Sequence, residues 1–225
     1  QSQINPHFLY NTLESITWMV EGGKNKDAVF MISELAKIFR ISLSNGKTII
    51  SIEDELKHCK NYMNIQKYRY KERFVTEYDV SEEIYQFCTV KLIIQPILEN
   101  AIYYGVGNMD ADDNPRILVR GWKNDNDIYL AVSDNGMGMR QEDVKNILSD
   151  NKKVPKHGSG VGLINVHTRI QLMFGVKYGL IVESEPDEGT TVTIHLPAVP
   201  YTEENCELLE NGVKKPGNEG DYDKT

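Results

Sequence analysis

The chain has 225 residues, which is enough for one or two domains with a buried core. Apolar residues make up 40% and charged residues 26%, as in ordinary soluble proteins, so the whole chain is neither disordered nor embedded in a membrane. The formal net charge of -8 argues against general electrostatic binding of nucleic acid or anionic lipid. No apolar run approaches ~18 residues, and neither an initiator Met nor a signal peptide opens the sequence. We therefore expect a piece from the middle of a longer gene product.

The first part of the chain, residues 1–73, repeats apolar residues at helical spacing. They form three narrow seams: Leu9, Leu13, Ile16 and Val20; Ile32, Leu35, Ala36, Phe39 and Leu43; and Leu56, Cys59, Met63 and Tyr70. Breaks at 22–23 and 44–46 separate the helices, and Ser51 with Asp54 has the spacing of a helix N-cap. Pro6 fits either the first turn of a helix or a kink in a longer one. Because such narrow seams cannot close a core alone, we expect two copies to form a C2 helical bundle.

The pattern changes after residue 73, from a helical to a mixed period. Strands are predicted over 74–80, 116–123, 127–133, 179–184 and 191–196, and helical patterns over 90–104 and 161–174. The strands form hairpins about 124–126 and 186–189. This interleaving predicts an α+β fold, in which an N-terminal dimerising helical bundle (1–73) precedes an α/β two-layer sandwich (74–200). Residues 201–225 are acidic and aperiodic, so we expect a disordered tail.

Three segments rich in glycine or amide side chains are candidates for a ligand site. One is Ser133-Asp134-Asn135-Gly136-Met137-Gly138, which ends a strand and by itself is typical of a turn. The second is Gly158-Ser159-Gly160-Val161-Gly162-Leu163, which is either a flexible loop or a phosphate site at a helix N-terminus. The third is the helical segment 95–101, where Asn100 could simply be a buried hydrogen-bonding residue.

The order of these segments carries more information than each segment alone. An amide on a helix, DxGxG, a polar loop, GxGxG at a helix start and then Gly189-Thr190 form a five-part pattern. Residues 90–197 thereby resemble the ATP-binding domain shared by histidine kinases, gyrase, Hsp90 and MutL. The segment Gln3-Ile4-Asn5-Pro6-His7-Phe8-Leu9-Tyr10-Asn11 is similar to the phosphoacceptor segment of LytS/YesM-type sensor histidine kinases of two-component systems.

The resemblance implies a role for each matched residue. His7 would accept the phosphoryl group, Asn100 would hold Mg²⁺ bridging the phosphates, and Asp134 would receive the adenine amino group. Residues 139–159 would form a lid over the nucleotide. The remaining nucleotide-binding positions that the resemblance implies are Gly136, Gly138, Gly158, Gly160, Gly162 and Thr190.

The chemistry of the residues around His7 agrees with this assignment. A neutral imidazole is a good nucleophile, and phosphoryl transfer mainly needs an in-line nucleophile, a metal and donors that spread negative charge. Asn11 lies four residues further on the same helical face, where it can orient the ring. The position two before Leu9 turns His7 away from the apolar seam, so we expect it to be exposed.

Some positions depart from the family pattern. Phe8 follows the histidine where many histidine kinases have an acidic base, which leaves Glu99 as a candidate by chemistry only. Pro96 stands where related ATPases have a water-activating Glu, which favours transfer over hydrolysis. Tyr103 or Tyr104 replaces a usual basic residue, so neutralisation of the phosphates would fall to other side chains. The candidates are Lys152, Lys153, Lys156, His157 and Arg169.

No metal site other than the one at Asn100 is expected. Three cysteines lie far apart without a CxxC spacing, which predicts a reducing compartment and no zinc cage. His58, His167 and His195 lack partners at metal-ligand spacing and are predicted to be structural.

The sequence therefore predicts the cytoplasmic kinase core of a sensor histidine kinase. It would autophosphorylate His7 from Mg-ATP and transfer the phosphoryl group to an aspartate of a response regulator, as a homodimer that binds no nucleic acid. A membrane-anchored sensor region would lie upstream, outside this chain. One alternative is an interaction module of the same fold that nucleotide controls without phosphorylation. Another, against which the His7 segment counts, is an anti-sigma-type serine kinase.

Overall fold

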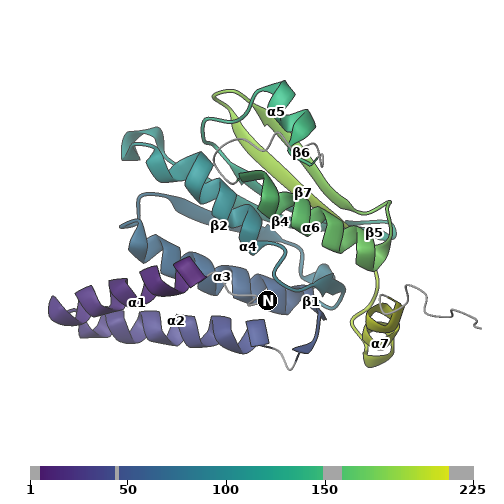
Figure 1. Ribbon diagram of the computed structural model, residues 1–225, viewed down its shortest axis with the longest axis horizontal. Coiled ribbons are helices and arrows are strands. Elements are labelled where there is room, and N and C mark those ends of the chain that lie inside the picture. The colour runs from purple at the N-terminus through teal and green to yellow at the C-terminus, as the bar shows by residue number, and fades with distance from the viewer. Residues whose placement is uncertain (1–5, 44–45, 149–158, 213–225) are drawn as a thin grey trace, which may run out of the picture.

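A computed structural model describes residues 6–43, 46–148 and 159–212. The chain starts with a helical hairpin of α1 (Pro6–Glu21) and α2 (Asn25–Leu43), which lie side by side (Figure 1). Gly23 adopts a left-handed φ of 72° in the turn between them, a conformation that glycine accepts without steric cost. Helix α1 begins at Pro6, at the position where proline is tolerated because its missing N–H has no partner inside the helix.

The packed face of the hairpin coincides only in part with the predicted apolar seams of its two helices, of which Ile16 and Leu35 are buried. On α1 the buried side chains are Phe8, Thr12 and Ile16, and only Ile16 belongs to the predicted seam. Four members of the two seams are exposed: Leu13, Val20, Ile32 and Leu43. Helix α1 packs against α2 and α3, and these seam positions are exposed in the part of the chain that the structure describes.

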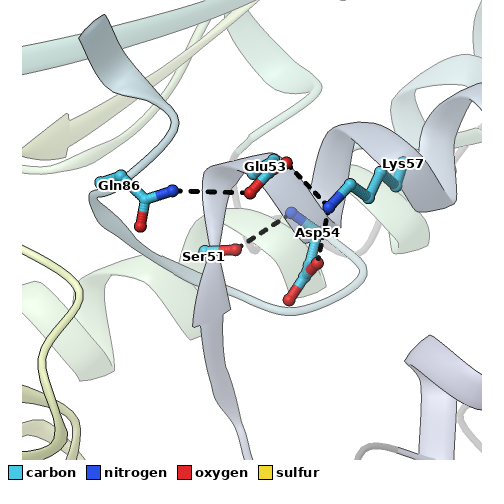
Figure 2. Close-up of polar contacts among 5 residues, drawn as sticks. All are labelled: Ser51, Glu53, Asp54, Lys57 and Gln86. Carbon is cyan, nitrogen blue, oxygen red and sulfur yellow. Dashed lines mark hydrogen bonds and ion pairs between the residues drawn. The ribbon is translucent and has the colours of Figure 1, made fainter. Parts of the chain in front are cut away.

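Helix α3 (Ile52–Arg69) begins at the predicted cap. The Ser51 hydroxyl accepts a hydrogen bond from the Asp54 N–H at 3.1 Å, which satisfies a free donor of the first turn (Figure 2). Glu53 forms an ion pair with Lys57 at 2.8 Å on the exposed side of the same turn (Figure 2). Two short strands that the sequence pattern did not predict, β1 (Ile49–Ser51) and β3 (Cys88–Val90), pair antiparallel next to this helix start. Helix α3 therefore contacts α2 on one side and the second half of the chain on the other.

A five-stranded sheet forms the second half, in the order β2-β4-β5-β7-β6. Its strands are β2 (Val75–Val80), β4 (Arg116–Asn124), β5 (Asp127–Asp134), β6 (Gly179–Glu185) and β7 (Gly189–Pro197). Both predicted hairpins, β4–β5 and β6–β7, are present. Strand β2 runs parallel to β4, and every other pair is antiparallel. The α+β class is confirmed.

Helices cover one face of this sheet (Figure 1). They are α4 (Gln95–Asn100), followed by a π-helical turn (Ala101–Gly105), and α6 (Ser159–Phe174), with the short α5 (Gln141–Asn146) near β6. Alternate strand residues such as Ile117, Leu130 and Ile194 point into the core, where they meet helix residues such as Leu98 and Ile170. The helix predicted over 90–104 is instead strand β3, a left-handed Leu92 (φ 59°) and then α4. Short 3-10 turns at Glu82–Ile84, Val106–Asn108 and Ala111–Asp113 complete this half.

The expected disordered tail is partly wrong. Helix α7 spans Glu203–Gly212, while residues 213–225 lie outside the described residues. Cys206 is buried, and the Glu210 carboxylate accepts hydrogen bonds from the N–H groups of Thr48 and Ile49, at 2.6 and 3.1 Å. A few anchoring contacts thus order a segment whose composition alone suggested disorder.

Candidate functional site

A cavity of about 300 Å³ opens between α4, α6 and the ends of β5 and β7. Its walls are mostly apolar, and two polar side chains with nucleotide-binding potential, Asn100 and Asp134, reach it from opposite elements. The residues that line it are Ile97, Asn100, Ala101, Tyr104, Gly105, Val132, Asp134, Met137, Gly138, Met139, Ile147, Leu163, Thr190 and Val192. An apolar slot with a few fixed polar groups suits a flat heteroaromatic ring.

Asp134 is the last residue of β5 and lies directly across from Thr190 of β7. Burial raises the pKa of its carboxyl group to about 6, although N–H groups of Gly136 and Thr190 oppose the shift. The Gly136 N–H donates to Oδ1 at 2.9 Å, so the carboxylate is held in one orientation. The group is therefore an acceptor with a fixed direction, as recognition of an exocyclic amine requires.

Close backbone contacts near Asp134 leave no room for a side chain at the neighbouring glycines. A Cβ on Gly136 would overlap the backbone of Gly105, and one on Gly138 would overlap the carbonyl of Glu185. Gly138 also has a φ of 62°, which side-chain-bearing residues rarely adopt. Gly105 was not identified from the sequence, yet a Cβ there would lie 2.6 Å from Asp134 Oδ1. Its signal was weak, because a glycine shortly after a helix is normally just a cap.

Ser184 is a second residue that sequence reasoning missed. Its hydroxyl donates to the Gly189 carbonyl at 2.7 Å and accepts from the Met139 N–H at 2.8 Å. These bonds tie the glycine-containing loop after β5 to the hairpin β6–β7. A serine in an alternating strand carries no signal for such a role, because strands often show serine on a solvated face.

Asn100, at the end of α4, lines the cavity, and its side chain carries a buried polar atom that has no hydrogen-bond partner in the described part of the chain. Its Nδ2 atom is buried without a hydrogen bond. A buried amide left unpaired costs free energy, about 1–3 kcal/mol, so such a group is expected to meet a ligand or water. The carboxamide oxygen on the same side chain is a suitable ligand for Mg²⁺. Asn100 could therefore supply one ligand to a metal ion.

The glycine segment before α6 is only partly described. Gly160 and Gly162 fall in the first turn of α6, and a Cβ on Gly162 would meet no described atom closer than Pro96 Cβ, at 3.7 Å. Gly158 and most of the expected lid, including Lys152, Lys153, Lys156 and His157, lie outside the described residues.

Arg169 does not belong to the cavity. Its Nη2 atom donates to the carbonyl of Lys91 at 2.6 Å, away from the lining residues. The suggestion that Arg169 neutralises phosphate is therefore wrong, because the guanidinium serves backbone carbonyls instead.

His7 lies near the start of α1 and is exposed, as predicted. Asn11 Nδ2 is 3.2 Å from Nδ1 and 3.1 Å from Nε2 of the imidazole, so the i, i+4 pair is in contact. The neighbouring Phe8 points the other way, into the helical core against Tyr62, with ring centroids 5.0 Å apart. The ring of His7 is thus open to a partner while its helix is anchored.

Of the other histidines within the described residues, His58, His167 and His195, none lines the cavity. His58 is buried on α3 with its Nε2 3.3 Å from the Ser42 hydroxyl, and burial lowers its pKa to about 4. His167 Nδ1 accepts from the Leu180 N–H at 2.9 Å, and His195 stacks on Tyr129.

Comparisons with known proteins agree with this geometry. The model of the family described as "Histidine kinase" matches residues 1–74, and that of the "Histidine kinase-, DNA gyrase B-, and HSP90-like ATPase" matches 89–200. Sensor histidine kinase YesM of Bacillus subtilis is 37% identical over 197 residues, 88% of this chain. The chain belongs to the sensor histidine kinase family. Sensor protein LytS of Staphylococcus saprophyticus is 29% identical over 92% of the chain.

This histidine kinase chain spans about a third of the length of these two relatives, 32% of YesM and 34% of LytS. The mycobacterial sensor histidine kinase MprB has the same fold over 68% of the chain and 99% of its own, with a TM-score of 0.51 and 17% identity. Among the described residues, no helix is long and apolar enough to cross a bilayer.

Proposed function

We propose that the protein autophosphorylates His7 from Mg-ATP and then passes the phosphoryl group to an aspartate of a response regulator. The observation that carries the proposal is the cavity in which the oriented Asp134 carboxylate and the unpaired Asn100 amide face the same space. Asp134 would accept the adenine amine, while Asn100 would hold the metal beside the phosphates. Gly136, Gly138 and Thr190 shape the adenine end, and the start of α6, with Gly158, Gly160 and Gly162, would border the phosphates.

In the transfer step, a ring nitrogen of His7 attacks the γ-phosphorus in line. The bond from phosphorus to the β–γ bridging oxygen breaks, an N–P bond forms and ADP leaves. Mg²⁺, when bound, neutralises charge on the phosphates. Asn11 keeps the imidazole oriented from one side of the helix. Glu99, which Gln95 contacts at 2.9 Å, is the candidate acceptor for the ring proton because it directly precedes Asn100.

The exposed apolar seams support the assembly part of the proposal. Leu13 and Val20 of α1 are 47% and 54% exposed, because no described residue of their own chain covers them. A second copy would bury the exposed seam residues of α1 and α2 in a four-helix arrangement. We further propose that a sensor region anchors the full-length protein in the membrane, with this chain on the cytoplasmic side.

One observation favours a second candidate function, a module that nucleotide controls without phosphorylation. None of the described residues that line the cavity is basic, and Tyr104 stands in the lining where related motifs carry a cation. The kinase proposal then needs cations from the residues before α6.

Incubation with γ-labelled ATP and Mg²⁺ tests the proposal and separates the two functions. A kinase should give label that is stable in alkali and lost in acid, the behaviour of phosphohistidine. ATP binding without any label would contradict the kinase and support the controlled module. Acid-stable label would indicate a serine kinase instead.

A further inference from the structure

A buried carboxylate joins helix α3 to the segment that leads into α4. Glu55 lies on α3 and is fully buried. Its Oε2 atom accepts a hydrogen bond from the Leu92 N–H at 2.7 Å, and its Oε1 atom accepts from Ile93 and Ile94 at 2.8 and 2.9 Å. Backbone N–H groups just before a helix have no acceptor within that helix. One side chain from α3 therefore satisfies three consecutive donors at the entry to α4.

The same segment is held from its other side by α6. Arg169 donates to the carbonyls of Lys91 and Leu92, at 2.6 and 3.5 Å. Leu92 between these contacts has a φ of 59°, a left-handed conformation that leucine rarely adopts and that its surroundings must maintain. Residues 91–94 are thus held from two sides. Glu55 accepts hydrogen bonds from their N–H groups, and Arg169 donates hydrogen bonds to their carbonyls.

The partners of Glu55 favour its charged form. Burial has the larger influence and leaves the pKa of its carboxyl group raised, whereas the three N–H donors and the positive charge of Arg169 partly offset that shift. A buried carboxylate without such donors would be strongly destabilising. Any movement of residues 92–94 away from α3 therefore has a large cost, and the two elements are expected to move together.

The entry segment determines where the cavity residues of α4 lie. Helix α4 has six residues and ends at Asn100, so displacement of its first turn displaces the amide that faces the cavity. On its other side, α3 is bonded to α2, where Glu34 accepts from Asn64 Nδ2 at 2.9 Å. A continuous set of contacts runs from the hairpin that carries His7 to Asn100.

We propose that Glu55 is a positioning residue that fixes Asn100 at the phosphate end of the cavity, so that the position of α3 controls metal-dependent nucleotide binding. This inference rests on the proposed function, because it assumes that Asn100 holds the metal beside the phosphates. It adds a defined contact through which the helical half acts on the nucleotide site.

The decisive variant is Glu55→Gln, which keeps the shape of the side chain. Its single carbonyl oxygen can serve Ile93 and Ile94, but its NH₂ group then faces the Leu92 N–H, donor against donor. Glu55→Asp is the milder variant, since it keeps the charge but is one methylene too short. Glu34→Gln is the matched control. Glu34 is also buried and joins α2 to α3 through Asn64, and its described hydrogen bonds, to Lys37 and Asn64, do not reach α4.

Two measurements on the whole chain test the proposal. Hydrogen exchange should show the amides of 92–94 exchanging at least tenfold faster in Glu55→Gln, and to a smaller extent in Glu55→Asp. Calorimetry with a non-hydrolysable ATP analogue should show that the gain in affinity on adding Mg²⁺ is lost in Glu55→Gln, while affinity in EDTA stays within twofold of wild type. Glu34→Gln should change neither quantity, even where it lowers the melting temperature equally.

The outcomes distinguish a failure of the role of Glu55 from a failure of the proposed function. If wild type binds nucleotide and gains affinity from Mg²⁺, but Glu55→Gln keeps this gain or the slow exchange at 92–94, the role of Glu55 is refuted and the proposed function stands. The same holds if Glu34→Gln loses the gain as well. If wild type shows no Mg²⁺-dependent binding of nucleotide, the proposed function itself fails. Should Glu55→Gln not fold, Glu55→Asp decides by the same two measurements.

Discussion

The nucleotide cavity and the helix that carries His7 are built in opposite ways. The cavity brings together groups far apart in the sequence, and its polar atoms are buried and directed before any ligand arrives, as the Gly136–Asp134 bond shows. His7, by contrast, lies on the exposed side of α1, where the side chain of Asn11, one turn further along the same helix, contacts its ring. The proposed binding site is thus preorganised, whereas the proposed nucleophile is accessible. Accessibility fits the proposed role, because a phosphoacceptor must meet both the γ-phosphate and a partner protein.

Replacement of His7 is expected to have the largest effect, and to affect phosphorylation without affecting nucleotide binding. His7→Gln should reduce alkali-stable labelling at least 100-fold, because no other nitrogen takes the place of the imidazole. Nucleotide affinity should stay within twofold of wild type, since His7 does not line the cavity. Labelling with γ-labelled ATP and calorimetry on the same sample check both halves. Equal labelling of the variant would show that the phosphoacceptor lies elsewhere.

Among substitutions in the cavity, one at Gly138 should have the largest effect. Gly138→Ala adds a Cβ that overlaps the Glu185 carbonyl at a positive φ, with an expected loss of about 2–4 kcal/mol in stability or in nucleotide binding. Thermal unfolding with and without ATP analogue would show which of the two is lost. Gly212→Ala in α7 is the matched control, because a Cβ there meets no atom within 4 Å and Gly212 does not line the cavity. A Gly138→Ala variant as stable and as tight as wild type would contradict the close packing described.

The adenine end should depend on the acceptor character of Asp134. Asp134→Asn presents a donor where the adenine amine needs an acceptor, and the mispaired contact should weaken ATP binding by ~1–3 kcal/mol. Calorimetry with ATP and with GTP would measure this, and discrimination against GTP should fall at the same time. Unchanged ATP affinity would place the adenine elsewhere.

We expect dimerisation to depend on the α1–α2 hairpin and not on the cavity. Leu13→Ser combined with Val20→Ser should weaken dimerisation by about 1–3 kcal/mol, since each removes apolar area expected to be buried between copies. Light scattering over a concentration series gives the dissociation constant, and nucleotide affinity serves as the internal control. A wild-type protein that stays monomeric at micromolar concentration would overturn the dimer.

The smallest effect concerns pH. The pKa of Asp134 is raised to about 6, so its carboxylate is ionised above that pH and can accept the adenine amine. Bound amine favours the ionised form, so affinity should be complete above pH 6 and fall severalfold as the pH drops through 6. Since ATP phosphates titrate in the same range, the measured quantity is the ratio of wild type to Asp134→Asn affinities. A ratio that stays constant from pH 5 to 8 would refute the assignment.

Local patterns in the sequence predicted much of the fold but not its long-range contacts. The hairpins and the Ser51 cap depend on residues near one another in the chain, and both were identified correctly. The strand β1 was missed because three residues show no period, and they become a strand only by pairing with β3. Leu13 and Val20 belong to a real apolar pattern, yet the pattern could not tell which partner each face would meet.

For the site, the order of the motifs predicted Asn100, Asp134, Thr190 and the glycines, and the structure brings Asn100, Asp134, Gly138 and Thr190 together around one cavity. Gly105 and Ser184 escaped notice because their roles arise from contact with residues distant in sequence. Glu55 escaped for the same reason: a glutamate in the first turn of a helix ordinarily indicates a favourable dipole contact. Its burial against residues 92–94 is a tertiary event that no local pattern signals.

The Glu210 contact has a consequence for how the chain is made. The N–H groups of Thr48 and Ile49, where the helical hairpin joins the rest of the protein, receive their acceptor from a residue 162 and 161 positions later. During synthesis the hairpin leaves the ribosome first, so these two N–H groups lack their acceptor until Glu210 has emerged. If two copies pair through their hairpins, as proposed, that pairing can begin before the Glu210 contact forms.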